Sequence, residues 1–278
     1  MNKILLLLVL VAGMASHAVV AQVLPRHAPY PGGVAIVKLG NADSPPVLDV
    51  TYGGRRVATV RREEGTLGIV GIPLDATPGM QRLHVAAGQG TVQLLYETGF
   101  EIRAKSYPVQ HLKIDPKFLK PSEVDQQRID REAVVITAAQ DYWSAEAPAS
   151  FLLDLPAQGR RSSNFGQARV LNGVPSVPHA GIDLAVNTGT PITAAAPGKV
   201  SNTGDYFYAG KSVFVDHGQG FFTLYIHLSR IDVKEGDVLE RGQRLGLSGA
   251  SGRVTGPHLH WGVLLNGVYV DPELFLRL

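Results

Sequence analysis

The sequence predicts a mainly β protein: a small β-sandwich, a connecting helix and then an antiparallel, barrel-like β region. Three observations support this fold class. The chain holds 31 glycines and 18 prolines, which implies many turns. Short apolar runs separated by turn residues fill most of the chain, as is typical of strands. A long segment with helix signals stands between two such β-rich stretches, just after Pro121.

Residues 1–21 are predicted to be a secretory signal. Lys3 gives a positive start, an apolar run covers 4–11, and small residues precede Gln22, so cleavage is expected after Ala21. The run is shorter than the roughly 20 residues that a transmembrane helix needs, which leaves an uncleaved anchor as the alternative. With no cysteine in the chain, the signal indicates an exported protein of the periplasm or cell envelope, or a secreted one.

Residues 22–110 are predicted to form the β-sandwich. Residues 47–52 and 57–60 flank Gly53-Gly54 and predict a hairpin. The segment has no cluster of metal ligands, and His84 is expected to be structural. Further strands are expected at 67–72, 83–86, 92–96 and 100–104.

Residues 111–147 are predicted to be a helical connector. Ser122 is a good N-cap residue, and Glu123 and Asp125 suit the positive end of a helix. The apolar face is only moderately regular, so we expect the helix to lie on the surface. The region 148–278 then returns to β structure, with its strongest strands expected at 213–215, 222–226, 244–247 and 259–264.

Five polar residues in the last region carry the chemistry. His258 and His260 lie in TGPHLHW, and alternation places them on one face of a strand. His179 and Asp183 are expected to share a side of another extended segment, and His227 ends a third strand. Imidazole and carboxylate suit zinc best, although ligand type alone leaves copper and nickel open. His217, before Gly218, is expected in a turn.

Five ordered motifs make the region resemble the LytM/lysostaphin-type zinc metalloendopeptidases, which hydrolyse peptide bonds in bacterial peptidoglycan. The resemblance implies that His179, Asp183 and His260 bind zinc, and that His227 and His258 act beside the metal. We expect His258 to be the general base and His227 to donate a hydrogen bond to the oxyanion. The motifs are SNFGQAR (163–169), PHAGIDLAV (178–186), DHGQGFFTLYIHLS (216–229), GLSGASGRVTGPHLHW (246–261) and VDPELF (270–275).

The leading hypothesis is therefore a zinc endopeptidase that cuts cross-links or stem peptides of peptidoglycan. The alternatives are a catalytically silent wall-binding regulator of another hydrolase and a secreted peptidase acting on glycine-rich protein. A net charge of +2 argues against a nucleic-acid partner. The N-terminal β-domain would either target the enzyme or inhibit it intramolecularly. Groove walls are expected at 171–177 and at 204–210, which includes Tyr206, Phe207 and Tyr208.

Overall fold

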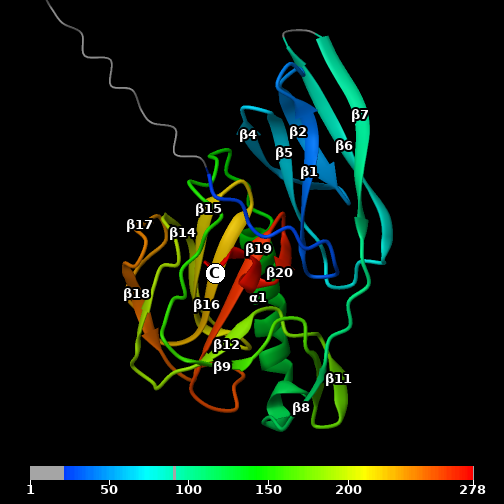
Figure 1. Ribbon diagram of the computed structural model, residues 1–278. Helices are drawn as coiled ribbons and strands as arrows, with labels where there is room; N and C mark the ends of the chain where they lie inside the picture. Colours follow the sequence, from blue (N-terminus) through cyan, green and yellow to red (C-terminus); the bar gives the residue numbers. More distant parts are fainter. Residues whose placement is uncertain (1–21, 90–91, 278) are drawn as a thin grey trace, which may run out of the picture.

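The computed structural model describes residues 22–89 and 92–277. It confirms a mainly β protein in which two β regions lie one above the other, with one long helix beside the larger region (Figure 1). No helix in the described ranges is long and apolar enough to cross a membrane. The predicted signal segment lies outside the described residues.

The smaller region is a sandwich of two antiparallel sheets. Their facing sides enclose a core that includes Val37, Val50, Val70 and Leu83, which is the packing expected when apolar residues alternate along each strand. The first sheet has the order β1 (Val34–Asn41), β5 (Gly65–Gly71), β4 (Ala58–Arg62), and the second has the order β3 (Arg55–Arg56), β2 (Val47–Tyr52), β6 (Gly79–Gln89), β7 (Val92–Ile102).

The predicted hairpin over 47–60 is wrong in its second strand. Only the short β3 returns along β2, with Thr51 opposite Arg56. The chain then crosses to the other sheet, where Ala58 in β4 pairs with Ile69 in β5. Val57 and Ala58 are almost fully buried at this crossing, Val57 in the core of the sandwich and Ala58 in a second cluster of buried side chains. The runs predicted at 92–96 and 100–104 are also joined, in one strand, β7.

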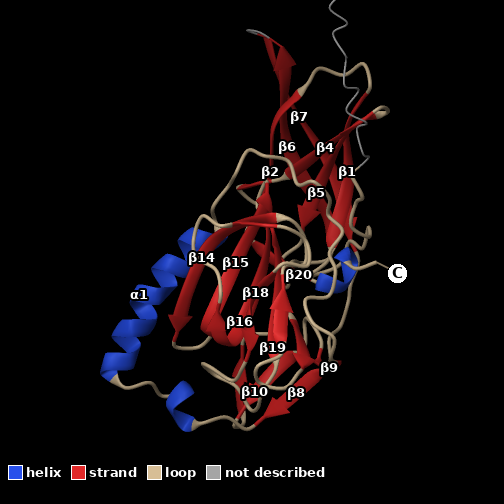
Figure 2. Cartoon of the chain, turned by 90° about the vertical axis from the view of Figure 1, so that its left-hand side faces the viewer, coloured by secondary structure: helices blue, strands red, loops and turns tan. Residues whose placement is uncertain are grey.

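The larger region is built on a long antiparallel sheet whose centre is β15, β16 and β19 (Figure 2). The strands are β8 (Val109–Leu112), β9 (Arg160–Ser163), β10 (Ala168–Leu171), β11 (Val174–Ser176), β12 (Ile182–Ala185), β13 (Pro191–Thr193), β14 (Gly198–Tyr206), β15 (Gly210–Gly218), β16 (Phe221–Ile231), β17 (Val238–Leu239), β18 (Arg244–Ser248), β19 (Leu259–Leu265) and β20 (Val268–Val270). The order in the sheet is β17-β14-β15-β16-β19-β12-β9, and β18 and β20 pair with β16 and β19.

The predicted helix is confirmed as α1 (Glu123–Gln140), preceded by the short 3-10 helix η1 (Pro116–Phe118). Ser122 is its N-cap, and its Oγ accepts a hydrogen bond from the Asp125 amide at 3.1 Å. No residue of α1 is buried, which agrees with a surface position. The helix runs along the outer side of the sheet next to β14 (Figure 2).

The two β regions share one hydrophobic core. Val34 and Ile69 of the sandwich belong to the same cluster of buried side chains as Phe151 and Trp261 of the larger region. A buried hydrogen bond from the Gly71 amide to Asn266 Oδ1, at 2.9 Å, also joins them. The sandwich is therefore docked on the larger region rather than tethered beside it.

Strand β8 comes directly after the sandwich, yet it pairs with the larger region. It runs parallel to β10, with Val109 opposite Ala168 and Leu112 opposite Leu171. A boundary between 110 and 111 falls inside this strand. The segment 109–112 is thus held by the same small sheet that carries β10 and β11.

His217 lies in β15 and not in the predicted turn. Its side chain is buried, with ring nitrogens 2.7 Å from the Pro197 carbonyl oxygen and 2.8 Å from Thr223 Oγ1. Burial lowers the pKa of His217 from 6.5 to about 4, because the charged ring would lose its hydration. His217 is therefore neutral at pH 7 and contributes to the fold as a hydrogen-bonded core residue.

We predict that His217 makes the protein sensitive to acid. Between pH 6.5 and about 4 the unfolded chain takes up a proton that the folded chain excludes, so stability falls as the pH falls. The loss amounts to roughly 3 kcal/mol for a shift of this size. Urea unfolding of the metal-free protein should show a flatter pH dependence for His217→Gln than for the wild type. His84→Gln, on an exposed side chain, is the control, and equal slopes for the wild type and His217→Gln would contradict the prediction.

Candidate metal centre

Neighbouring strands of the sheet bring three of the predicted residues together. Asp183 in β12 lies directly opposite His260 in β19. His260 in turn pairs with Ile226 in β16, and His227 is the next residue of that strand. Cross-strand partners of this kind have side chains within about 5.5 Å at Cβ. The sheet register therefore sets the proximity of Asp183 and His260.

His179 reaches the same point from a loop. The prediction that His179 and Asp183 share one extended segment is wrong, because only Asp183 lies in β12. In one strand the Cα atoms of His179 and Asp183 would be about 13 Å apart, too far for their side chains to touch. In the structure His179 Nε2 is 2.9 Å from Asp183 Oδ1. Main-chain hydrogen bonds hold the loop: the His179 amide donates to Gln167, and the His179 carbonyl accepts from Gly166.

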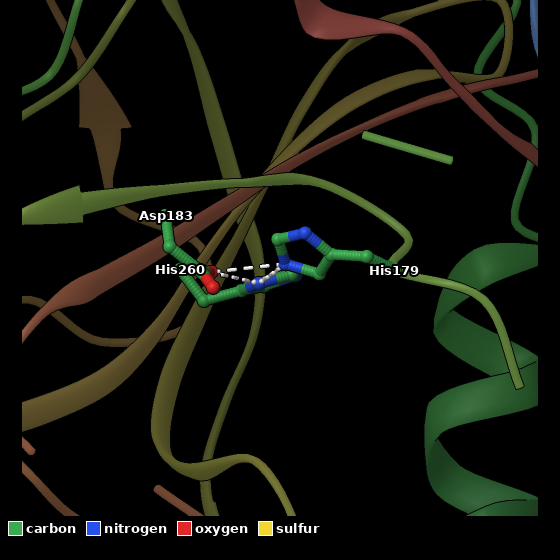
Figure 3. A group of neighbouring side chains, drawn as sticks. All are labelled: His179, Asp183 and His260. Atoms are coloured by element: carbon green, nitrogen blue, oxygen red, sulfur yellow. Dashed lines mark hydrogen bonds and ion pairs between the residues drawn. The ribbon is translucent and has the colours of Figure 1, made fainter. Parts of the chain in front are cut away.

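The three side chains point at one another (Figure 3). His260 Nδ1 lies 2.8 Å from Asp183 Oδ1 and 2.9 Å from His179 Nε2. His179 and Asp183 are buried, with 1% and 7% exposure, and His260 is partly buried. Three atoms of the types that bind a metal ion thus converge from the loop, β12 and β19.

The hydrogen-bond partners of His179 indicate that a cation belongs here. Its Nδ1 lies 2.8 Å from the Asn164 carbonyl oxygen, which only accepts, so Nδ1 carries the proton and Nε2 keeps its lone pair. Burial lowers the pKa of His179 to about 4, so the ring is neutral near pH 7. Its lone pair then faces an Asp183 carboxylate oxygen, an arrangement that is unfavourable without a positive ion between them.

Asp183 is the anionic member of the group. Burial by itself raises its pKa, but the neighbouring His179 and His260 outweigh burial and hold the pKa of Asp183 well below its ordinary range. Its second oxygen, Oδ2, is 3.3 Å from an Arg169 guanidinium nitrogen. Both carboxylate oxygens are thus engaged, one toward the histidines and one toward Arg169. The donor set is two imidazoles and one carboxylate, which fits a divalent transition metal.

His227 and His258 stand beside this group. Their ring centres are 4.9 Å apart, and His258 Nε2 is 3.8 Å from Asp183 Oδ1. His227 has a backbone φ of 67° at an irregularity in the pairing of β15 with β16. Such bulges change the direction of a side chain. Here the residue with left-handed backbone geometry is a histidine beside the candidate metal ligands, and unusual backbone conformations are common at functional sites.

Backbone carbonyls orient both rings. His227 Nδ1 is 2.8 Å from the Ser251 oxygen, and His258 Nδ1 is 2.8 Å from the Gly256 oxygen. Each Nδ1 therefore donates, which leaves Nε2 free in the neutral form. Burial, followed by the neighbouring His260 and His258, lowers the pKa of His227 to about 3.

The histidines open onto a pocket of about 250 Å³ whose walls differ from those predicted. Of 171–177 only Leu171 lines it, and of 204–210 no described residue does. Tyr206 and Phe207 are buried packing residues instead, and Tyr208 lies under Arg253. The lining comprises Gln110, Leu112, Ile114, Ser162, Ser163, Arg169, Leu171, Asp183, Ala185, His227, Arg253, Val254, Thr255, Gly256, Pro257, His258 and His260.

Sequence reasoning missed three contributors to this pocket. Gln110 comes from β8, and only the pairing of β8 with β10 brings it there. Arg169 and Arg253 lie inside the motifs at 163–169 and 246–261, so their proximity to the motif histidines in the sequence was an available signal. From the sequence alone, both arginines look like ordinary surface residues. Only the structure shows that they are partly buried at the pocket.

Comparison with known proteins assigns the fold and the site to a class of peptidases. A model of "Peptidase family M23" matches residues 177–272, and one of "Peptidase family M23 N-terminal domain" matches 27–102. A solved structure from Pseudomonas aeruginosa, assigned to peptidase M23, is 43% identical and has a TM-score of 0.75. The similarity covers 90% of this chain and 95% of that one. The chain therefore belongs to peptidase family M23, and the resemblance found in the sequence is confirmed.

Curated relatives match over part of the chain. Peptidoglycan DD-endopeptidase ShyA of Vibrio cholerae is 47% identical over 109 residues, which are 39% of this chain and 25% of the relative. The DD-carboxypeptidase/endopeptidase Mpg of Neisseria meningitidis is 43% identical over 94 residues, or 34% of this chain and 22% of the relative. The matched region thus spans about a quarter of the length of these relatives.

We predict that Gly181 is needed for metal binding. A Cβ at this position would lie 2.5 Å from the Trp261 carbonyl oxygen and 2.8 Å from His260 Nε2. Gly181→Ala should therefore displace the loop between two candidate ligands and weaken metal binding about 10- to 100-fold, the range seen when the partners of metal ligands are changed. Competition with a chromophoric chelator measures the affinity. Gly262→Ala is the matched control, because its nearest contact would be an ordinary 3.4 Å, and equal affinities in the two variants would contradict the prediction.

Proposed function

We propose that the protein is a zinc-dependent endopeptidase that hydrolyses peptide bonds in bacterial peptidoglycan. One observation carries the proposal. His179 Nε2, Asp183 Oδ1 and His260 Nδ1 converge within 2.9 Å at the edge of a pocket, beside two further imidazoles with free Nε2 atoms. Membership of family M23 supports the same reaction class.

Zinc fits the donor set. It binds imidazole nitrogen and carboxylate oxygen, and a catalytic site uses three protein ligands so that one position stays open. His179, Asp183 and His260 would be those ligands. When bound, zinc would act as a Lewis acid toward the scissile carbonyl and lower the pKa of a water molecule to roughly 7.

His258 is the proposed general base. Its Nδ1 proton is directed to the Gly256 carbonyl, so Nε2 carries the lone pair that accepts a proton. Nε2 also faces Asp183, which places it on the side of the ligands. The Gly256 hydrogen bond fixes the ring orientation during this transfer and stabilises the imidazolium that results.

His227 is the proposed hydrogen-bond donor to the developing oxyanion. Its Nδ1 is occupied by the Ser251 carbonyl, so donation must come from Nε2. A neutral ring has no proton there, and the pKa of about 3 keeps the resting ring neutral. The role therefore requires His227 to hold a proton during turnover, and the neighbouring His258 ring, 4.9 Å away, is its nearest partner for sharing one.

Peptidoglycan is the proposed substrate because relatives that match part of the chain are named as peptidoglycan DD-endopeptidases and a DD-carboxypeptidase/endopeptidase. The predicted signal at 1–21 would deliver the chain to the periplasm or cell envelope, where this polymer lies. Cleavage there would serve wall remodelling or lysis.

The N-terminal region is proposed to influence the site through β8. Each residue that lines the pocket lies between Gln110 and His260, so the described part of the sandwich forms none of its walls. Intramolecular inhibition by the sandwich would act through the shared core or through this strand, which links the docked sandwich to Gln110 at the pocket. Targeting by the sandwich would need neither route.

Digestion of purified sacculi tests the function. The full chain should release soluble muropeptides, identified by mass as products of peptide-bond cleavage, and a chelator should abolish the release until zinc is restored. A protein that binds sacculi without releasing products would instead be a silent regulator. Cleavage of a glycine-rich protein but not of sacculi would favour the secreted-peptidase alternative.

Replacing His258 separates the base from the ligands. His258→Ala should keep its zinc, measured by elemental analysis, but lose about 10²- to 10⁴-fold in kcat, which is the usual contribution of a general base. His260→Ala is the comparison variant and should lose the metal itself. Near-normal turnover in zinc-loaded His258→Ala would make the base assignment wrong.

A further inference from the structure

The pocket beside the metal ligands contains a cation that has neither a hydrogen-bond partner nor an acidic partner among the described residues. Arg253 lines the pocket and is only partly exposed. A guanidinium offers five N–H donors, yet among the described residues its side chain makes no hydrogen bond and no ion pair. Partly enclosed charges are usually paired. An unpaired one that faces a substrate pocket indicates an anionic ligand.

Arg253 is held firmly in this position. Its amide donates to the Tyr208 carbonyl at 2.8 Å, and its guanidinium carbon lies 4.9 Å from the centre of the Tyr208 ring. That ring packs edge-on against Phe207 and also contacts Phe118. Tyr208, which was predicted to form a groove wall, thus packs against the Arg253 guanidinium, and Phe207 packs against Tyr208. A supported guanidinium loses less freedom when it binds a ligand.

A second arginine lines the same pocket. Arg169 makes one contact, at 3.3 Å, with Asp183 Oδ2, and its buried Nε has no hydrogen-bond partner among the described residues. Asp183 is the only acidic residue in the described lining, and its two oxygens are already engaged by Arg169 and the histidines. It therefore does not neutralise Arg253.

We propose that Arg253, with Arg169 beside it, binds a carboxylate carried by the substrate residue next to the scissile bond. The inference rests on the proposed peptidase function and deepens it by naming the group that is recognised. Arginine suits this task because its planar fork matches a carboxylate in two parallel hydrogen bonds. The pocket then orients the peptide by its charge as well as by its shape.

Wall peptides offer this carboxylate from two sources. In a cross-link made through a diamino acid, the residue on the amine side of the cleaved amide carries a free carboxylate. In an uncross-linked stem, the terminal residue carries one in the equivalent position. The chemistry is the same, so the two substrates must be compared directly.

The experiment compares three zinc-loaded proteins: the wild type, Arg253→Gln and Arg253→Lys. The substrates are a cross-linked muropeptide dimer, the same dimer with the carboxylate beside the scissile bond amidated, and a stem that ends in a free carboxylate. Arg244→Gln is the matched control, because Arg244 is exposed and pairs with Asp232, and neither residue lines the pocket. Zinc content is measured for each protein.

We expect Arg253→Gln to lower kcat/KM about 10- to 100-fold on substrates with the free carboxylate, the size of a lost charged hydrogen bond. The amidated dimer should be cleaved equally by the wild type and Arg253→Gln. Arg253→Lys keeps the charge but loses the paired N–H donors of the guanidinium. On substrates with the free carboxylate, its kcat/KM should lie between those of the wild type and Arg253→Gln. Dependence on Arg253 for the dimer alone identifies the cross-link as the source, and for the stem alone identifies the terminus.

An equal loss on free and amidated substrates, or no loss at all, overturns the proposal. Calorimetry with a D-alanyl dipeptide that the protein does not cleave measures binding without turnover. The dipeptide is compared with its carboxylate free and amidated. If the wild type cleaves no wall peptide but binds the free dipeptide through Arg253, the proposed hydrolysis fails while the carboxylate site stands. If the wild type neither cleaves wall peptides nor binds the dipeptide through Arg253, both the proposed hydrolysis and the carboxylate site are wrong.

Discussion

The convergence of His179, Asp183 and His260 is the constraint on which the rest of the site depends. Three electron-rich atoms lie within 2.9 Å of one another, and two of the three side chains are almost fully enclosed. Enclosure removes the water that would otherwise separate their charges. A bound cation would remove the repulsion between these atoms. The geometry of the site is therefore favourable only when a cation is bound.

Backbone carbonyls determine the chemistry of the imidazoles around that site. The backbone carbonyls of Asn164, Ser251 and Gly256 each accept a hydrogen bond from the Nδ1 of one histidine, which leaves the Nε2 atoms of His179, His227 and His258 free. The tautomers thus depend on loop and strand backbone and not on further titratable groups. This is the usual way in which surroundings orient metal ligands and bases.

The shared core gives the N-terminal half a structural route to the site. Val34 and Ile69 pack in one cluster with Trp261, which directly follows the ligand His260. The chain then leaves the sandwich as β8 and forms a wall of the pocket with Gln110. The catalytic region is therefore completed by residues that precede the part of the chain matched by the peptidase family model.

The fold class, the helix that begins after Ser122 and the five polar residues of the site were all predictable from the amino-acid sequence. Alternation, capping and ligand type are local properties, so short segments reveal them. Three features required the folded chain: His179 lies in a loop, the chain changes sheets before β4, and Arg253 faces the pocket with no ion-pair partner among the described residues. These features depend on which strands pair and on what is enclosed. Both are contacts between distant segments, such as Asp183 and His260, which no local pattern specifies.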